Sequence, residues 1–327
     1  MSRQNISSFS GTLYLKGGFF MEKNMKINFA VLKDRVIDSL DHTDLERIRK
    51  ELKKLDKPTI TSGVGGSSVV SEFASRMLNQ KNKIITSNKE PRDFLYENTN
   101  GYSNVIACSY SGNNFGVDLS FQNDLKKYLL SNNAFANPEV TYLDYKTTMD
   151  KERSFISLGA TLIPISILMD YYEDGKQDRI LDSMKETKFL IENKGFVYEI
   201  FSGKDTSTTS KYLESTLVES GIGVPIVHDK YSFCHGRTTF GYHNQSTAIY
   251  LNRNTDFDKI LLEELKPYYD QILVIDSLFQ DPILDDYQML IQAMYLTKQL
   301  AEQKGVDLSK IDYSPVVKQL YKYSGNI

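Results

Sequence analysis

The stretch TSGVGGSSVVSEFASRML (residues 61–78) determines which fold the sequence predicts. An apolar run is followed there by a loop of glycines and serines, and the loop is followed by a helical pattern. A second stretch, NVIACSYSGNN (residues 104–114), follows the same plan. Glycine lets a backbone approach a ligand closely, and the first turn of a helix presents N–H groups without partners. Such loops bind phosphate in many proteins. Two of them from one sheet converge, so the sequence predicts a phosphorylated small molecule as the ligand.

Composition sets limits on the class of protein. The chain has 327 residues, 40% of them hydrophobic and 25% charged, which is enough for two globular domains. The net charge is −3 and the charges are well mixed, so we expect no nucleic-acid partner. The longest apolar stretch, residues 160–169, contains a proline and is too short to cross a bilayer, so we expect no membrane partner. Two cysteines form no disulfide framework, which favours the cytoplasm.

Strand-like and helix-like segments alternate along the chain, which is typical of parallel α/β folds. A helical pattern over 24–57 precedes the alternation, and a polar helical bridge over 174–193 interrupts it. The expected strands are residues 58–63, 83–88, 104–110, 140–145, 196–203, 223–228, 246–252 and 271–276. The expected helices between and after them are residues 67–79, 115–130, 152–172, 207–219, 257–268 and 288–304.

We therefore predict two three-layer α/β/α domains with parallel sheets that form a pseudo-symmetric pair. The expected parts are a flexible leader over 1–23, a first domain over 24–175, a second over 176–306, and a tail over 307–327. The leader shows no signal-peptide pattern. Met21 or Met25 is an alternative natural start.

The first loop (residues 63–68) and the second loop (residues 109–114) supply neutral donors, which bind a phosphate without burying a lysine. The alternative for each is a plain strand-to-helix turn with a helix cap. A partial dinucleotide fingerprint, Gly63-x-Gly65, has Ser68 in place of its third glycine, and no acid ends the next strand. The residues that we expect to bind substrate are Gly65, Gly66, Ser67, Ser68, Ser109, Ser111, Asn113 and Asn114.

The segments GVGGSS, SYSGNN and ERSFISLGATLIP together resemble a sugar isomerase (SIS) domain. Members carry a small-residue first loop, an S-x-S-G second loop, and a Glu-containing segment before a Ser/Thr-rich helix. That Glu matches Glu152, to which the resemblance assigns substrate binding. The second half resembles another SIS domain, as in the isomerase part of glucosamine-6-phosphate synthase and in phosphoglucose/phosphomannose isomerases. The resemblance covers roughly residues 45–325. It implies a five-stranded parallel sheet between helices in each domain and a tail over 307–327 that covers the site.

The resemblance also assigns two catalytic residues, Glu219 in LVESG and His235 in CHGRTT. It implies that Glu219 moves a proton between C1 and C2, whereas His235 opens the sugar ring. Such a base works best when it is shielded from water, and histidine titrates near neutral pH. The alternatives are a solvated helix end and a capped loop histidine. The lysine that the synthase carries one turn before the Glu is Thr216 here, so this departure leaves open whether ammonia or amino-sugar chemistry accompanies the proton transfer.

Further expectations concern the edges of the site. Arg237 could bind a phosphate or carboxylate in a bidentate manner, or form a surface ion pair. SIS isomerases often end in a segment that supplies a lysine, for which Lys318 is the first candidate and Lys322 the second. We expect no metal, because no carboxylate spacing accompanies His228, His235 and His243. Relatives complete the site with a His-bearing loop from a neighbour, which implies a homodimer.

These observations predict a sugar-phosphate isomerase or deaminase that works through a cis-enediol. No organic cofactor is expected, since acid–base chemistry suffices to form the enediol. The alternative is a non-catalytic SIS sensor that binds a sugar phosphate without turnover. A third reading, a nicotinamide dehydrogenase, rests on the partial glycine fingerprint alone.

Overall fold

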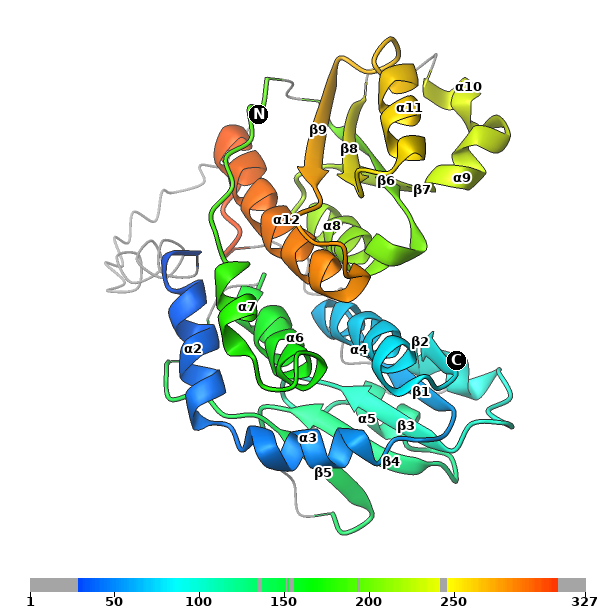
Figure 1. Cartoon of the computed structure of the whole chain (residues 1–327), viewed down its shortest axis with the longest axis vertical. Coiled ribbons are helices and arrows are strands. Elements are labelled where there is room, and N and C mark those ends of the chain that lie inside the picture. Colours follow the sequence, from blue (N-terminus) through cyan, green and yellow to red (C-terminus); the bar gives the residue numbers. More distant parts are fainter. Residues whose placement is uncertain are drawn as a thin grey trace, which may run out of the picture.

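The computed structural model describes residues 29–133, 137–150, 152, 156–192, 195–241 and 246–310 (Figure 1). The expected leader lies outside the described residues. So do Lys318, Lys322 and His243.

The first sheet has five parallel strands in the order β2-β1-β3-β4-β5. The chain passes from β1 outward to β2 and then returns to the other side of β1 for β3, so the direction of winding reverses between β1 and β3. In open α/β sheets of this order, ligands bind in the crevice outside the carboxyl ends of the strands at that reversal. The strands are β1 (Thr59–Ser62), β2 (Thr86–Lys89), β3 (Asn104–Cys108), β4 (Lys126–Ser131) and β5 (Val140–Asp144).

The second sheet follows the same plan, with four parallel strands in the order β7-β6-β8-β9. Its reversal falls between β6 and β8. The described residues therefore contain two α/β domains with parallel sheets, as predicted, but a fifth strand in the second sheet is not among them. The strands are β6 (Val197–Ser202), β7 (Val224–Asp229), β8 (Thr247–Asn252) and β9 (Gln271–Asp276).

Four helices lie between the two sheets: α4, α6, α8 and α12 (Figure 1). They share one hydrophobic core that includes Phe73 of α4, Leu213 of α8 and Leu290 of α12, so the two domains are packed as one body. The bounds of these helices are α4 (Gly66–Asn82), α6 (Leu158–Tyr172), α8 (Ser207–Glu219) and α12 (Pro282–Lys304). Three further helices are α2 (Leu32–His42), α3 (Leu45–Lys53) and α7 (Gln177–Asp182).

Shorter helices cover the outer faces. Val117 of α5 packs on Ala107 and Leu129 of the first sheet in a small separate core. Leu261 of α11 packs on Phe201 of the second sheet in another. The outer elements are η1 (Pro91–Leu95), α5 (Phe115–Ser120), η2 (Lys204–Thr206), α9 (Lys230–Ser232), η3 (Phe233–Arg237), α10 (Thr238–Gly241) and α11 (Asp256–Leu265).

The predicted helix over 115–130 is wrong. Helix α5 ends at Ser120, and strand β4 occupies the rest of the segment. The side chain of Asn123 accepts a hydrogen bond from the Leu125 N–H at 3.1 Å, which builds a turn between the two elements. The apolar residues after this turn are buried on both faces of the sheet, and periodicity does not distinguish such a short run from a buried helix.

Three other helix predictions are too long. The segment over 24–57 breaks between α2 and α3, because Asp44 caps α3 by accepting from the Arg47 N–H at 3.0 Å. Within 174–193, only α7 is helical in the described residues. Helix α6 begins at Leu158 rather than at 152, with Ser157 as its N-cap.

A buried ion pair joins the two domains. Arg76 of α4 bonds to Asp286 of α12, whose side chain is fully buried. Asp286 also accepts from the N–H groups of Thr208 at 3.2 Å and Thr209 at 3.1 Å, at the start of α8. Burial lowers the pKa of Arg76 to about 10, so the guanidinium remains charged at neutral pH. This carboxylate therefore fixes α8 relative to α4.

We predict that Asp286→Ala lowers the free energy of unfolding by about 3–5 kcal/mol, because it leaves the Arg76 charge buried without its partner. Urea denaturation measures the change. Lys259→Ala, which removes an exposed ion pair with Asp256, is the control and should leave the midpoint unchanged. A midpoint for Asp286→Ala equal to that of the control would contradict a structural role for the pair.

Candidate functional site

The first loop needs glycine at two positions. Gly65 has φ 57° and ψ −132°, a conformation that residues with a Cβ rarely adopt. A Cβ on Gly63 would lie 2.2 Å from the carbonyl oxygen of Ser67. The backbone therefore turns sharply out of β1 into α4, which brings the loop N–H groups to the carboxyl edge of the sheet.

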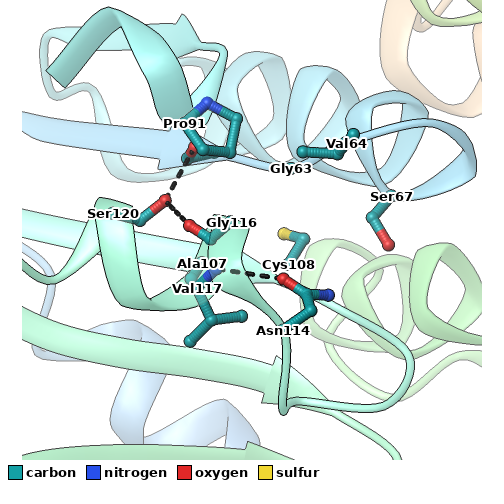
Figure 2. Close-up of a pocket in the computed structure, with 11 residues that line it drawn as sticks. Gly63, Val64, Ser67, Pro91, Ala107, Cys108, Asn114, Gly116, Val117 and Ser120 are labelled. Carbon is teal, nitrogen blue, oxygen red and sulfur yellow. Dashed lines mark hydrogen bonds between the residues drawn. The ribbon is translucent and has the colours of Figure 1, made fainter. Parts of the chain in front are cut away.

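The two serines of the first loop have different roles. Ser68 is buried, and its hydroxyl donates to the Gly65 carbonyl at 2.7 Å, so it closes the first turn of α4. Ser67 is half-buried, and its hydroxyl makes no hydrogen bond within the described residues. Figure 2 shows this hydroxyl pointing toward the segment that carries Asn114. Ser67 is therefore the serine of this loop that a ligand could reach.

The second loop is shaped by its own side chains. The hydroxyl oxygen of Ser109 accepts from the Gly112 N–H at 3.1 Å and from the Asn114 amide at 2.8 Å. The amide oxygen of Asn114 caps α5 by accepting from the Val117 N–H at 3.1 Å (Figure 2). Ser109 is buried, so it holds the loop in shape from inside.

Two other residues of the second loop remain open to solvent. Ser111 is half-buried, and Asn113 is exposed. Their side chains make no hydrogen bond within the described residues, although the Ser111 carbonyl accepts from Asn133 at 3.1 Å. The loop thus presents one hydroxyl and one amide to an approaching ligand.

The two loops enclose a common pocket, here called the loop pocket (Figure 2). It lies at the carboxyl ends of β1 and β3, where the direction of winding reverses, and contains about 220 Å³ of space including its open mouth. Its walls are Ser62, Gly63, Val64, Ser67, Pro91, Ala107, Cys108, Asn114, Gly116, Val117 and Ser120. The structure thus brings Ser67 and Asn114 together, as the sequence predicts for the two loops.

Some residues that line the loop pocket were not predicted from the sequence. The Ser120 hydroxyl donates to the Gly116 carbonyl at 2.8 Å, which leaves its oxygen to accept from the Ser62 hydroxyl at 3.0 Å. Gly116 and Ser120 stand one turn apart on α5, a spacing that could have been noticed. Pro91 comes from η1, and no pattern in the sequence points to it.

Cys108 forms part of the floor of the loop pocket. Burial raises the pKa of its thiol to about 12, so the group is neutral at physiological pH. A neutral sulfur does not repel an anion. The floor is therefore compatible with a bound phosphate.

Glu152 lies at the start of α6. Its carboxylate accepts from the Ser157 hydroxyl at 2.6 Å and from the Gly159 N–H at 2.7 Å. The other carboxylate oxygen is buried with no hydrogen-bond partner in the described residues. Burial raises the pKa of Glu152, and the Ser157 hydroxyl, the Gly159 N–H and the nearby charge of Arg35 offset part of that rise. Glu152 is not a wall of the loop pocket. Its carboxylate instead accepts from the first turn of α6.

Glu219 comes from the second domain, as the last residue of α8. A Cβ built on Gly65 would lie 4.0 Å from its Oε1 atom, so the carboxylate stands beside the first loop. The side chain is exposed rather than shielded as expected for a base of this kind. Glu219 therefore lies near the first loop, as a shared site requires. The expected burial of its carboxylate is wrong for the single chain, in which the side chain is exposed.

His235 and Arg237 occupy the irregular segment η3 between α9 and α10. Both side chains are exposed. Figure 1 shows α9 and α10 beside α11 on the outer side of the second domain. Within the described residues, neither side chain contacts Glu219 or the two loops through a hydrogen bond or an ion pair. Whether Glu219 and His235 act as a pair, within one chain or between two, therefore stays a prediction.

The equivalent crevice of the second sheet is occupied by an arginine. Arg253 follows β8 and pairs with Asp205, which follows β6, at 3.1 Å. It also bonds to Asp285, whose side chain is fully buried. The two domains thus share a topology, but at this position the second holds an internal ion-pair cluster.

Three general features limit other kinds of site. Within the described residues, no cluster of three His, Cys, Asp or Glu side chains could hold a metal ion. None of the helices in this part of the chain combines the length and apolar character needed to cross a membrane. Both cysteines are free thiols, Cys108 buried and Cys234 exposed.

Comparison with known proteins gives matches in structure only. No family model matches the sequence, and no curated protein matches it. The tagatose-6-phosphate ketose/aldose isomerase from Escherichia coli is 12% identical, with a TM-score of 0.67 over 91% of this chain and 97% of its own. The fold of this chain is that of phosphosugar isomerases.

Two further structures show the same likeness. Glucosamine-6-phosphate deaminase from Thermotoga maritima is 12% identical, with a TM-score of 0.63 over 90% of this chain and 97% of its own. The C-terminal domain of glucosamine-fructose-6-phosphate aminotransferase from Francisella tularensis is 13% identical, with a TM-score of 0.58 over 91% of this chain and all of its own. The TM-scores establish a common fold, whereas identities this low leave the activity of this chain to be argued from its site.

We predict that Glu152→Gln becomes more stable relative to the wild type as the pH rises from about 4 to about 7. The raised pKa of Glu152 means that the folded state binds its proton more tightly than the unfolded state. Wild-type stability therefore falls as the pH passes from the unfolded to the folded pKa, whereas glutamine does not titrate. Thermal melts of both proteins across this range measure the difference, and a constant difference would contradict the burial of this carboxylate.

Proposed function

We propose that this chain is a SIS-type sugar-phosphate isomerase or deaminase whose loop pocket binds the phosphate group. The observation that carries the proposal is the convergence of two small-residue loops on one pocket at the reversal of the first sheet. The sugar phosphates named for the isomerase and the deaminase of the same fold support the choice of ligand.

The phosphate would be bound by neutral donors. Ser67 and Asn114 are walls of the loop pocket, and we propose that Ser111 and Asn113, which are half-buried and exposed in the same second loop, supply further side chains. The N–H groups of Ser67 and Ser68 already bond to carbonyls of the first loop at 3.1 and 2.8 Å. The N–H groups of Gly65 and Gly66 would therefore meet the anion, while the Ser68 and Ser109 hydroxyls hold the two loops in shape.

Proton transfer would fall to Glu219. A sugar with its phosphate in the loop pocket would extend past Gly65 toward Glu219, whose Oε1 atom lies 4.0 Å from a Cβ built on that glycine. Its carboxylate would remove a proton from one carbon and return it to the neighbouring carbon through a cis-enediol. The bound sugar would itself displace water from the exposed carboxylate.

Ring opening would require a second subunit. His235 is exposed and makes no hydrogen bond or ion pair with Glu219 or the two loops within the described residues, so we propose that a homodimer brings it to the site of the neighbouring subunit, with Arg237 beside it. Val64 and Val218 flank the site with 51% and 59% of their surfaces exposed, and an approaching subunit or tail would cover them. Lys318 in the tail and a cytoplasmic location remain part of this proposal.

The second candidate is a non-catalytic sensor of sugar phosphates. It is favoured by the exposure of Glu219, since a carboxylate in water is a weak base. A sensor would keep the loop pocket and its ligand but lack turnover. The two candidates therefore share binding and differ in proton exchange.

We predict that the wild type exchanges the C2 proton of a hexose or hexosamine 6-phosphate in D2O, and that Glu219→Gln reduces the rate by roughly 10²–10⁴-fold. NMR of the sugar follows the exchange. Binding should survive in the variant, so the sugar phosphate should still raise the melting temperature of both proteins.

Glu214→Gln, an exposed change on the same helix, is the control and should exchange at the wild-type rate. Equal exchange by the wild type and Glu219→Gln would refute the role of Glu219. Thermal stabilisation without any exchange by the wild type would instead identify a sensor.

We also predict that an equal mixture of Glu219→Gln and His235→Ala subunits regains about one quarter of wild-type activity after unfolding and joint refolding. Half of the dimers are then mixed, and each has one site with both native residues if His235 acts across the interface. Exchange measurements on the mixture and on each variant alone provide the test. A mixture no more active than its components would place His235 elsewhere.

A further inference from the structure

A hydroxyl stands one helical turn before Glu219. Ser215 of α8 donates to the Oε1 atom of Glu219 at 2.7 Å. The two residues are four positions apart, the spacing at which side chains on a helix meet. Both lie at the surface of α8 that faces solvent rather than the shared core.

The same carboxylate oxygen faces the first loop. Oε1 of Glu219 is the atom within 4 Å of a Cβ built on Gly65. Ser215 and the first loop therefore both lie near this oxygen, Ser215 through a hydrogen bond and the loop without one. Oε2 has no hydrogen-bond partner in the described residues, so it is the oxygen available for proton transfer.

The backbone at Glu219 is already fixed. The Ser220 N–H donates to the Thr216 carbonyl at 3.0 Å, and the Ser220 hydroxyl donates to the same carbonyl at 2.6 Å. Gly221, with φ 69°, ends the helix, and Ile222 is fully buried. What remains free is the glutamate side chain, which loses substantial rotamer entropy when it is held in place.

The neighbouring position on α8 cannot perform this task. Thr216 is 5% exposed and directed into the protein. Of the residues within one turn of Glu219, Ser215 is the one whose side chain donates to the carboxylate in the described structure. Its donor is neutral, so it orients the carboxylate without neutralising it.

We propose that Ser215 is a positioning residue for proton transfer, which holds Oε1 of Glu219 against the first loop and directs Oε2 toward the substrate. The inference rests on the proposed function, because it assigns a role within the same site. Ser215 acts through Glu219 and does not contact the sugar itself. Its loss should therefore slow the reaction without weakening the binding of substrate.

The test compares Ser215→Ala and Ser215→Thr with the wild type in the C2 exchange assay, with a hexose or hexosamine 6-phosphate in D2O. We expect Ser215→Ala to lower kcat roughly ten- to a hundredfold and to leave KM within about twofold, since a misplaced base costs rate rather than affinity. Ser215→Thr keeps the hydroxyl and should restore kcat to within about threefold. Glu214→Ala is the matched control on α8 and should match the wild type.

A wild-type kcat for Ser215→Ala would overturn the proposal. So would equal losses in the alanine and threonine variants, because the hydroxyl would then not be the cause. Crystal structures of the wild type and Ser215→Ala add a readout that needs no turnover: the Glu219 carboxylate should leave Gly65 in the variant. If the wild type exchanges no proton, the proposed function fails, whereas an unmoved carboxylate would refute the positioning role alone.

Discussion

The reversal of strand order between β1 and β3 is the constraint on which the site depends. Helices that follow these two strands must leave in opposite directions, since α4 covers the inner face of the sheet and α5 the outer face. The loops before them separate, and the loop pocket lies in the gap. Glycine at position 65 and the Ser109–Asn114 bonds then shape the walls of a gap that the topology has already created.

In the second domain, an arginine and its ion pairs occupy the corresponding position. Its sheet reverses between β6 and β8 in the same way, but Arg253 enters the crevice and bonds to two carboxylates. This domain instead contributes α8, which packs on α4 through the shared core and places Glu219 next to Gly65. Two copies of one topology therefore have separate tasks, with anion binding proposed for the first and proton transfer for the second.

Much of this arrangement could be predicted from the sequence. The strand–loop–helix order places both loops correctly, and the expected bounds of the helix that ends at Glu219 are confirmed. Strand β4 could not be recognised, because its apolar residues are buried on both faces and follow a turn without glycine or proline. The buried position of the Ser109 side chain could not be predicted either, because it depends on hydrogen bonds within the second loop that residue spacing does not indicate. The position of His235 could not be predicted, because it depends on contacts between segments far apart in the sequence. Its pairing with Glu219 in catalysis stays a prediction.

The most direct measurement is a crystal structure of the protein with a hexose 6-phosphate bound. The account predicts that the phosphorus lies in the loop pocket, within hydrogen-bond reach of Ser67 and the N–H groups of Gly65 and Gly66, with the sugar carbons directed toward Glu219. A phosphate bound outside the two loops, or a loop pocket closed by Ser67 and Asn114 while the sugar occupies another crevice, would contradict it.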